Sequence, residues 1–293
     1  MEHPLVSIGL PVYNGAHRMR VAVDSLLAQT YRHFELIISD DGSTDETAQI
    51  CREYAARDTR VRSIRQEKNK GHLENIYFVL HAARGEFFML AADDDRWHER
   101  FLEDALETLV RHPHHGVAMS SFERTDEKGE RIAVASYTGD LDLTEQGYLA
   151  VTTKMMLRRP IHIFLYGLFR IELLRGLFSR PAPEVVGWDR VVMTEMALAT
   201  HFVSLAPVRF FKYSHAVPVK KRYRGQAVGS VYHDAWPYTK YVGAMLTRVF
   251  TSPLIPWYRK PLIIIPWFRL MWRYRGSLRF ELRGGRRVSA SAR

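Results

Sequence analysis

Three consecutive carboxylates follow an apolar run in the first half of the chain. Asp93, Asp94 and Asp95 come directly after the segment 87–92, which is almost wholly apolar. Such a run is typical of a buried strand, and acids cannot continue into the core because burying unpaired charge is costly. They are therefore expected at the strand's exit, where clustered carboxylate oxygens suit Mg²⁺ or Mn²⁺ carrying a phosphate. An acidic turn that caps the following helix is the alternative interpretation.

Two further strands end in polar residues of a kind that could hold a nucleotide. Pro11, Tyr13 and Asn14 follow the predicted strand 6–10, and Asp40 and Asp41 follow the predicted strand 34–39. An aromatic ring can stack on a base, while a carboxylate accepts hydrogen bonds from the base's N–H groups. Parallel strands present such residues at one edge of a sheet. Simple packing and helix capping are the competing explanations for the same side chains.

The elements that must position these residues alternate between strand and helix. The connections are too long for hairpins, which predicts an α/β fold with a mostly parallel central sheet and helices on both faces. Cys51, the only cysteine, falls on one of these helices and is expected to be a buried structural thiol. The predicted strands are 6–10, 34–39, 61–64, 87–90 and 117–121. The predicted helices include 17–28, the helix with Cys51 that follows Thr44 and ends near residue 56, 73–83 and 100–111.

The best-known nucleotide-binding fingerprints are absent. The first strand is not followed by G-x-G-x-x-G, and no G-x-x-x-x-G-K-[ST] occurs anywhere in the chain. The sequence therefore lacks the signatures of dinucleotide-binding dehydrogenases and of P-loop proteins.

The second half has a looser pattern with two features that could serve chemistry. The segment 187–190 opens a predicted helix that reaches about residue 199 and carries Asp189 near its start. Two strands are expected near 202–205 and 208–213, followed by a basic loop that contains Arg222 and Arg224. Helix capping by Asp189 and a solvated basic loop are the plainer interpretations.

Charge is unevenly distributed in this 293-residue chain of formal net charge +10. Residues 200–293 contain 18 of the 42 Lys and Arg residues, but only Asp234 and Glu281 as acids. Trp, Tyr and Phe are interleaved with arginine over residues 236–280. This composition favours an anionic partner, which could be a lipid surface, a polyphosphate-linked substrate or nucleic acid. We expect an anionic membrane surface, with packing of the aromatic residues on the catalytic domain or on a second subunit as the alternative.

Taken together, the motifs resemble the inverting GT-A glycosyltransferases of family 2. The resemblance covers roughly residues 5–225 and is most specific in the first half. It rests on Ser7-x-x-x-Pro11-x-Tyr13-Asn14, Gln29-Thr30, Glu35, Asp40-Asp41-Gly42-Ser43-Thr44-Asp45, Asn69-x-Gly71, Gly85-Glu86 and Asp93-Asp94-Asp95.

The resemblance implies a GT-A nucleotide-diphospho-sugar transferase fold and assigns roles to the residues already singled out. Those expected to bind the nucleotide are Pro11, Tyr13, Asn14, Asp40, Asp41, Asn69, Lys70 and Asp93. It implies Asp94 and Asp95 as ligands of Mg²⁺ or Mn²⁺, with Asp93 nearer the ribose. Asp189 would be the general base, and Arg222 and Arg224 would steady the departing diphosphate.

The implied partners are a nucleotide-diphosphate sugar donor and a glycan or lipid-linked acceptor, in cell-envelope polysaccharide or glycolipid synthesis. No nucleic-acid-binding module is recognised. Neither a signal peptide nor an apolar run of 18 residues is found, so we expect a cytoplasmic protein, peripheral on the inner face of the membrane. A nucleotidyltransferase-like enzyme and a non-catalytic membrane-associated scaffold are the alternative functions.

The expected domain organisation follows from these features. A catalytic domain is predicted over 1–225, with a nucleotide-binding half at 1–121 and an acceptor-binding half at 122–225. A helical, basic and aromatic C-terminal extension is expected over 226–283, and 284–293 is expected to be a disordered tail.

Overall fold

A computed structural model of the chain describes residues 3–126, 130–132, 143, 146–157, 165–185, 187–213 and 237–282. The chain divides into two compact units that interleave along the sequence. One, here called the sheet unit, comprises Met1–Glu145, Tyr166–Phe178 and Phe202–Ala216. The other, the helical unit, comprises Gln146–Leu165, Ser179–His201 and Val217–Arg293.

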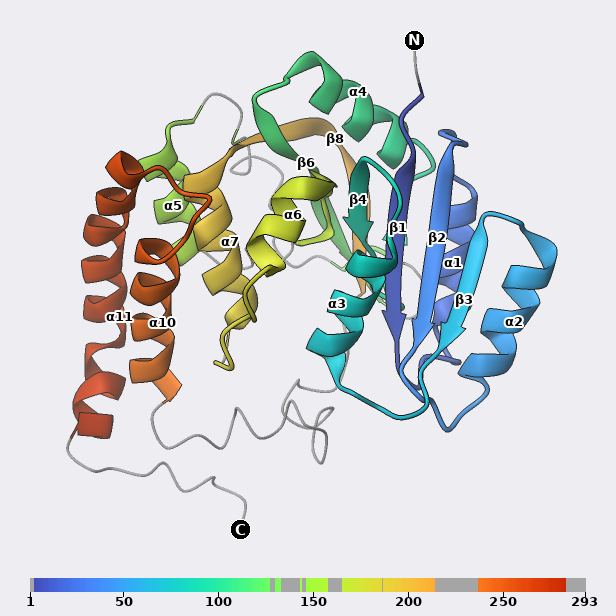
Figure 1. Cartoon of the computed structure of the whole chain (residues 1–293), viewed down its shortest axis with the longest axis horizontal. Helices are drawn as coiled ribbons and strands as arrows, with labels where there is room; N and C mark the ends of the chain where they lie inside the picture. The colour runs from blue at the N-terminus through green and yellow to red at the C-terminus, as the bar shows by residue number, and fades with distance from the viewer. Residues whose placement is uncertain are drawn as a thin grey trace. The chain divides into compact units, whose positions relative to one another are not determined.

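The described strands of the sheet unit form an eight-stranded sheet in the order β3-β2-β1-β4-β7-β6-β8-β5. Its first part is parallel, with β1 lying between β2 and β4 (Figure 1). β2 pairs in parallel with β3 on its other side. These parallel strands are β1 (Val6–Val12), β2 (Phe34–Asp40), β3 (Val61–Arg65) and β4 (Phe87–Leu90).

Strand β1 continues through Pro11, where the sequence predicted that it would stop. Pro11 pairs with Ser39 of β2, whereas the ladder with β4 ends at Gly9 and Leu90. Among the described strands, β1 has a partner on one side only beyond Gly9, and a proline is tolerated at such an edge because no second ladder needs its missing N–H. The strand is therefore two residues longer than predicted, and the loop that contains Tyr13 and Asn14 begins after Val12.

The reversal of strand order between β3 and β4 places helices on both faces of the parallel part. Right-handed crossovers from β1 to β2 and from β2 to β3 use one face, and the return crossover to β4 uses the other. Figure 1 shows α3 in front of the sheet and α1 behind it. The helices are α1 (Met19–Leu27), α2 (Thr47–Arg57) and α3 (His72–Ala82).

The rest of the sheet is mixed rather than parallel. β7 (Leu168–Arg170) is antiparallel to both β4 and β6 (His115–Thr125), and β5 (Arg96–Trp97) is antiparallel to β8 (His201–Tyr213). The predicted strand 117–121 therefore does not extend the parallel order. β8 is one strand that runs through Pro207, where two strands were expected. Helices α4 (Phe101–Arg111) and α6 (Ile171–Phe178) belong to this part.

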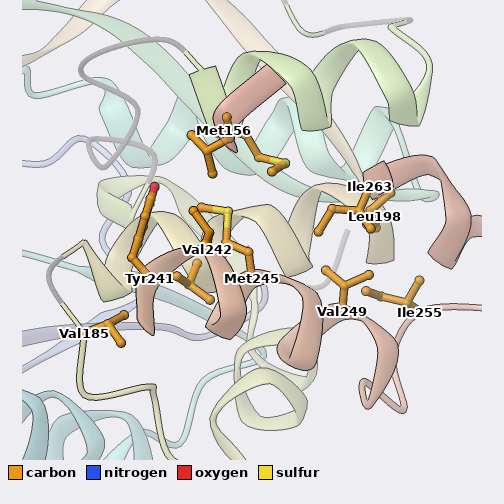
Figure 2. Close-up of a cluster of buried hydrophobic side chains, with 11 residues drawn as sticks. Met156, Val185, Leu198, Tyr241, Val242, Met245, Val249, Ile255 and Ile263 are labelled. Carbon is orange, nitrogen blue, oxygen red and sulfur yellow. The ribbon is translucent and has the colours of Figure 1, made fainter. Parts of the chain in front are cut away.

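The helical unit has its own apolar core. Tyr241, Val242, Met245 and Val249 recur on one face of α10 and are buried with Leu198, as Figure 2 shows. This spacing is that of an amphipathic helix. Its elements are α5 (Tyr148–Leu157), α7 (Trp188–Ala199), α10 (Pro237–Phe250), the 3₁₀ helix η2 (Trp257–Ile263) and α11 (Ile264–Leu282).

A buried ion-pair cluster ties α7 to the segments around it. Glu195 on α7 is fully buried and accepts a 2.7 Å hydrogen bond from Arg180. Its other carboxylate oxygen accepts from Arg248 of α10. Because a buried carboxylate needs compensation, these two arginines allow an acid to lie in the interior of the unit.

Several sequence predictions fall outside the described residues. They include the domain boundary at 225, the basic loop that contains Arg222 and Arg224, and the expected tail 284–293. Within the described part of the chain, no helix is long and apolar enough to cross a membrane.

Candidate functional site

The three acids lie where the order of the parallel strands reverses. β4 ends at Leu90, and the N–H of Ala91 still donates to Gly9 O of β1 at 2.8 Å. The chain then leaves the sheet into Asp93–Asp95. The gap between the carboxyl ends of β1 and β4 is a topological switch point, the place where open α/β sheets bind ligands. The acids therefore lie at the exit of a strand, as predicted.

Asp95 is held by two groups at the end of β8. Its Oδ2 lies 2.6 Å from Lys212 Nζ, and its Oδ1 accepts a 3.0 Å hydrogen bond from the Tyr213 N–H. Asp95 is only 1% exposed, and the Lys212 ammonium also lies 4.8 Å from the centre of the Tyr166 ring. Both oxygens of this carboxylate are thus engaged by the protein itself.

Burial and charge act in opposite directions on this pair. Burial raises the pKa of Asp95 to about 6, and the Lys212 ammonium acts to lower it. Burial acts to lower the pKa of Lys212, but the neighbouring Asp95 carboxylate outweighs it and the pKa is raised. Lys212 therefore stays charged and supplies fixed positive charge behind the acids.

Asp93 points back toward the loop after β1. A Cβ atom placed on Gly15 would lie 2.5 Å from Asp93 Oδ2, so the carboxylate occupies the space that a side chain at position 15 would need. Burial, together with the charge of Asp94, raises the pKa of Asp93 to about 7, while the guanidinium of Arg18 acts to lower it. Arg18 also lies 5.8 Å from the ring centre of Tyr213.

Asp94 also lies near Lys212. Its Oδ1 lies 3.9 Å from Lys212 Nζ, and its side chain is 14% exposed. Crowded carboxylates with raised pKa values gain from a cation, because it relieves their mutual repulsion. Among the described residues no three His, Cys, Asp or Glu side chains form a cage for a metal ion. Mg²⁺ in nucleotide enzymes needs only one or two carboxylates besides the phosphates, so the donor set fits.

The loops after β1 and β2 are locked together by hydrogen bonds. Asn14 adopts a left-handed backbone with φ 51°, and its N–H donates to Ser43 Oγ at 2.9 Å. In return, its side-chain oxygen accepts from the Thr44 N–H at 2.9 Å. Tyr13 is half-buried beside this junction, and Pro11 is buried in β1. The predicted nucleotide residues of the two strands are thereby brought together.

The adjacent acids Asp40 and Asp41 differ in their surroundings although both are buried. Asp41 accepts 2.9 Å hydrogen bonds from the N–H groups of Lys70 and Gly71, which anchors the turn 69–71 that contains the predicted nucleotide residues Asn69 and Lys70. Asp40 Oδ1 accepts from the Ser43 N–H at 2.9 Å. Its Oδ2 accepts no hydrogen bond from the described residues and lies 3.7 Å from Arg65 Nε. A buried carboxylate oxygen without a donor is an acceptor that a ligand could use.

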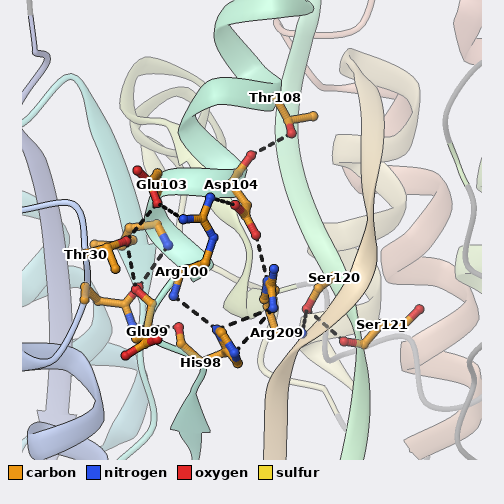
Figure 3. Close-up of polar contacts among 12 residues, drawn as sticks. Thr30, His98, Glu99, Arg100, Glu103, Asp104, Thr108, Ser120, Ser121 and Arg209 are labelled. Carbon is orange, nitrogen blue, oxygen red and sulfur yellow. Dashed lines mark hydrogen bonds and ion pairs between the residues drawn. The ribbon is translucent and has the colours of Figure 1, made fainter.

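A polar network supports the chain just after the acids (Figure 3). The His98 N–H donates to Arg209 O of β8 at 2.9 Å, and Arg209 Nε donates to Asp104 Oδ2 at 2.7 Å. Arg100 pairs with the same Asp104 at 3.1 Å. Together with the pairing of β5 and β8, these contacts fix the backbone that leaves Asp95.

Asp189 stands in the first turn of α7 in the helical unit. The cap is Gly187, whose φ of 82° is left-handed, so Asp189 is not itself the capping residue. Its Oδ1 accepts a 2.8 Å hydrogen bond from the Arg190 N–H. The predicted diphosphate residues Arg222 and Arg224 lie outside the described residues.

Sequence reasoning did not single out Lys212, Arg18 or Gly15. Lys212 had a detectable signal, because it shares a strand face with the buried Phe210 two residues earlier. A lysine on a core-facing position calls for a carboxylate partner. For Arg18 and Gly15 no local pattern pointed to Asp93, which lies more than seventy positions away.

Comparison with curated proteins finds glycosyltransferases over parts of the chain. An uncharacterised glycosyltransferase of Rickettsia felis is 27% identical over 229 residues, which covers 76% of this chain and 35% of that protein. TuaG of Bacillus subtilis, named for teichuronic acid biosynthesis, is 36% identical over 107 residues, 36% of this chain and 42% of its own length. The chain thus spans between about a third and a half of the length of these relatives.

Solved structures share the fold at low sequence identity. S. aureus TarS 1–349 in complex with UDP-GlcNAc has a TM-score of 0.70 at 18% identity, covering 97% of this chain and 76% of that one. The mannosyltransferase PcManGT of Pyrobaculum calidifontis, in complex with GDP-Man and Mn²⁺, has a TM-score of 0.55 at 18% identity, with coverages of 97% and 80%. The predicted GT-A fold is confirmed. The sequence profile described as "Glycosyl transferase family 2" matches residues 7–170, more than half of the chain, which therefore belongs to that family.

Proposed function

We propose that the chain transfers a sugar from a nucleotide-diphosphate donor to a hydroxyl group of an acceptor, with inversion at the anomeric carbon. The observation that carries the proposal is one connected edge of the sheet unit. Asp93 packs on the loop at Gly15, Asn14 of that loop bonds to Ser43, and Ser43 bonds to Asp40. The groups that we propose for the base and for the diphosphate are connected by these contacts, which supports binding of a nucleotide sugar.

For the nucleoside end, Asp40 is a better candidate than Asp41. Asp40 Oδ2 has no hydrogen-bond donor among the described residues, whereas both oxygens of Asp41 are taken by the 69–71 turn. We therefore assign recognition of a base N–H group to Asp40 and stacking to Tyr13. Asp41 holds Asn69 and Lys70 in place beside them, and Pro11 and Asn14 shape the loop between.

For the diphosphate end, we assign the metal to Asp94 and the ribose to Asp93. A divalent cation there would supply positive charge to the diphosphate oxygens. Asp95 stays a predicted ligand, but both its oxygens already accept from Lys212 and Tyr213, so its main work is to hold the acid segment in place. Arg222 and Arg224 would share the charge of the departing diphosphate.

Asp189 is the proposed general base. The acceptor oxygen would form a bond to the anomeric carbon as the bond to the diphosphate breaks, and the hydroxyl proton would pass to the Asp189 carboxylate. Attack on the side opposite to the leaving group inverts the configuration. Asp189 accepts one hydrogen bond from the Arg190 N–H through Oδ1.

For the acceptor, we propose a glycan or lipid-linked hydroxyl in cell-envelope polysaccharide or glycolipid synthesis. The likeness to TuaG supports an envelope polysaccharide. The basic C-terminal residues support the proposal that the protein acts at the cytoplasmic face of an anionic membrane.

A donor screen tests the first step. Thermal unfolding of the full chain is measured with UDP and GDP sugars, each with Mn²⁺ and with EDTA. We expect one nucleotide class to raise the unfolding temperature, and the rise to depend on the metal. Asp40→Asn and Asp94→Asn should each remove the rise. If no nucleotide sugar stabilises the protein, the proposed function is wrong.

A second experiment tests the role of Asp189 with the donor found in this way. Asp189→Asn should lower transfer by at least about a hundredfold, the usual contribution of a general base, while donor binding is unchanged. Glu172→Gln, which changes an exposed acid in the first turn of α6, is the matched control and should leave both unchanged. Retention of the donor's anomeric configuration in the product would rule out inversion.

A further inference from the structure

The aromatic residues of the C-terminal helices divide into two groups that the sequence alone does not separate. In α11, Trp267 donates its indole N–H to Val242 O at 2.8 Å, and Leu270 is fully buried. Tyr274 packs on Tyr238, with ring centres 5.0 Å apart. These side chains form the face by which α11 contacts α10, which lies beside it in Figure 1.

The opposite face of α11 carries large apolar side chains in water. Ile265, Phe268 and Trp272 are 54%, 61% and 69% exposed. Their spacing of three and four residues places them in one stripe along the helix. Trp257 and Tyr258 of η2, just before α11, are 82% and 58% exposed. Single exposed apolar residues are ordinary, but a continuous stripe of this kind marks an interaction surface.

Arginines border this stripe. Arg269 and Arg273 follow Phe268 and Trp272 directly in sequence and are exposed. Arg275 lies with its guanidinium 4.5 Å from the ring centre of Trp272. Arg279, one helical turn beyond Arg275, is also exposed. No salt bridge joins Arg269 or Arg279 to an acid of the described residues.

The one acid of α11 does not offset this charge at the surface. Glu281 is 5% exposed and accepts hydrogen bonds from the N–H groups of Tyr238 and Thr239 at 3.1 and 3.0 Å. Its carboxylate therefore serves the first turn of α10. The outward face of α11 is left with apolar and positively charged groups only.

We propose that this face, formed by Ile265, Phe268, Arg269, Trp272, Arg275 and Arg279, lies in the head-group layer of an anionic membrane. Trp and Phe favour the boundary between head groups and acyl chains, and arginine binds lipid phosphates. Each basic residue near an anionic surface adds to binding. The inference rests on the membrane association in the proposed function and assigns that contact to one face of α11. It does not depend on sugar transfer.

A second copy of the chain is the competing occupant and fits less well. In a two-fold symmetric contact the same patch faces itself. Arg269, Arg275 and Arg279 would then approach their own counterparts without an exposed acid on α11 to pair with, and like charges across an interface are unfavourable. An anionic lipid surface complements both the charge and the apolar stripe.

Vesicle co-sedimentation of the full chain tests the proposal without donor or acceptor. We expect binding to phosphatidylcholine vesicles that contain phosphatidylglycerol, and little binding to phosphatidylcholine alone. Phe268→Ser with Trp272→Ser should weaken binding by about tenfold or more, since partial burial of two aromatic rings is lost. Arg269→Gln with Arg279→Gln should weaken it by about fivefold for each charge.

Matched controls come from exposed residues of the sheet unit. Val21→Ser and Val110→Ser change side chains that are 61% and 58% exposed, and Arg20→Gln removes an exposed arginine. These variants should bind vesicles as the unchanged chain does. Because the substituted residues are all exposed, every variant should fold, which circular dichroism checks.

Three results would overturn the inference. The first is that the full chain does not bind anionic vesicles. The second is that the control variants lose as much vesicle binding as the variants of α11. The third is that Phe268→Ser with Trp272→Ser turns a dimer into a monomer while vesicle binding is unchanged. The last would assign the face to a second copy. A chain that binds vesicles but is stabilised by no nucleotide sugar would contradict the proposed function and leave the membrane surface standing.

Discussion

The ammonium of Lys212 and the carboxylate of Asp95 lie 2.6 Å apart, although 117 positions separate them in the chain. The pair joins the end of β8 to the acid segment after β4. Asp95 is almost wholly buried, so its charge depends on this partner.

We predict that Lys212→Met lowers the free energy of unfolding by about 3–5 kcal/mol, because it leaves a buried carboxylate without compensation. Urea denaturation measures the change. The double variant Lys212→Met with Asp95→Asn should recover part of the loss, since no uncompensated charge then remains. Strictly additive losses in this cycle would show that the two residues do not stabilise each other.

Gly15→Ala should disturb the acid site from the opposite side. The new Cβ would lie 2.5 Å from both Asp93 Oδ2 and a methyl group of Val12, so at least one of them must move. We expect a loss of about 1–3 kcal/mol in stability, as for other overpacked sites, and weaker donor binding. Gly147→Ala is the control, because a Cβ there meets nothing within 4 Å. Equal unfolding midpoints for the two variants would contradict the packing argument.

Glu35 should make the sheet unit sensitive to acid. Burial acts to raise its pKa, but hydrogen bonds from Arg62, Ser7 and the Arg84 N–H outweigh it, so the pKa of the folded state lies below the ordinary 4.5. A lowered pKa means that the stabilisation is complete above about pH 4.5 and is lost as pH falls through the folded value.

We expect Glu35→Gln to cost about 1.5–3 kcal/mol at neutral pH, typical of charged hydrogen bonds, and to flatten the fall of stability below pH 5. Urea denaturation across the acid range measures both effects. Glu107→Gln, which changes an exposed acid, is the control and should leave the fall of stability below pH 5 unchanged. If stability falls below pH 5 in Glu35→Gln as it does in the unchanged chain, another group is responsible for the acid sensitivity.

Cys51 should be inert in the folded protein. It is 1% exposed on α2, and burial raises the pKa of its thiol to about 12. At pH 8 the thiolate fraction would be about one part in ten thousand, far below that of an ordinary cysteine. Alkylation should therefore be slow in buffer and fast in urea. Native labelling at the rate of a free thiol would contradict the buried position.

Much of the parallel part of the fold could be read from local sequence. Apolar runs of strand length, separated by helical patterns, predicted β1, β2 and β4, and polar residues at their ends predicted where Asn14, Asp40 and Asp93 lie. The buried thiol of Cys51 was also expected and is confirmed. These features are predictable because the pattern of neighbouring residues indicates which segments are buried strands and which are polar loops.

The antiparallel part could not be derived in the same way. Nothing local in 117–121 distinguishes a strand that continues the parallel order from one that pairs with β7 in the opposite direction. Pro11 suggested a strand end, yet it lies inside β1, because a proline's cost depends on whether a neighbouring strand needs its N–H. That neighbour is set by the whole sheet.

The sequence by itself determined the family, the strand exits that carry the candidate site and the residue types available there. Only the tertiary structure decided that, within the described part of the chain, Asp40 Oδ2 accepts no hydrogen bond while both oxygens of Asp41 hold the segment 69–71. It also decided that Lys212 engages Asp95, and that Trp267 faces inward while Trp272 faces water. The physical reason is common to all of these. A charged or aromatic side chain acquires its role from the partner that burial brings to it, and those partners come from distant parts of the chain.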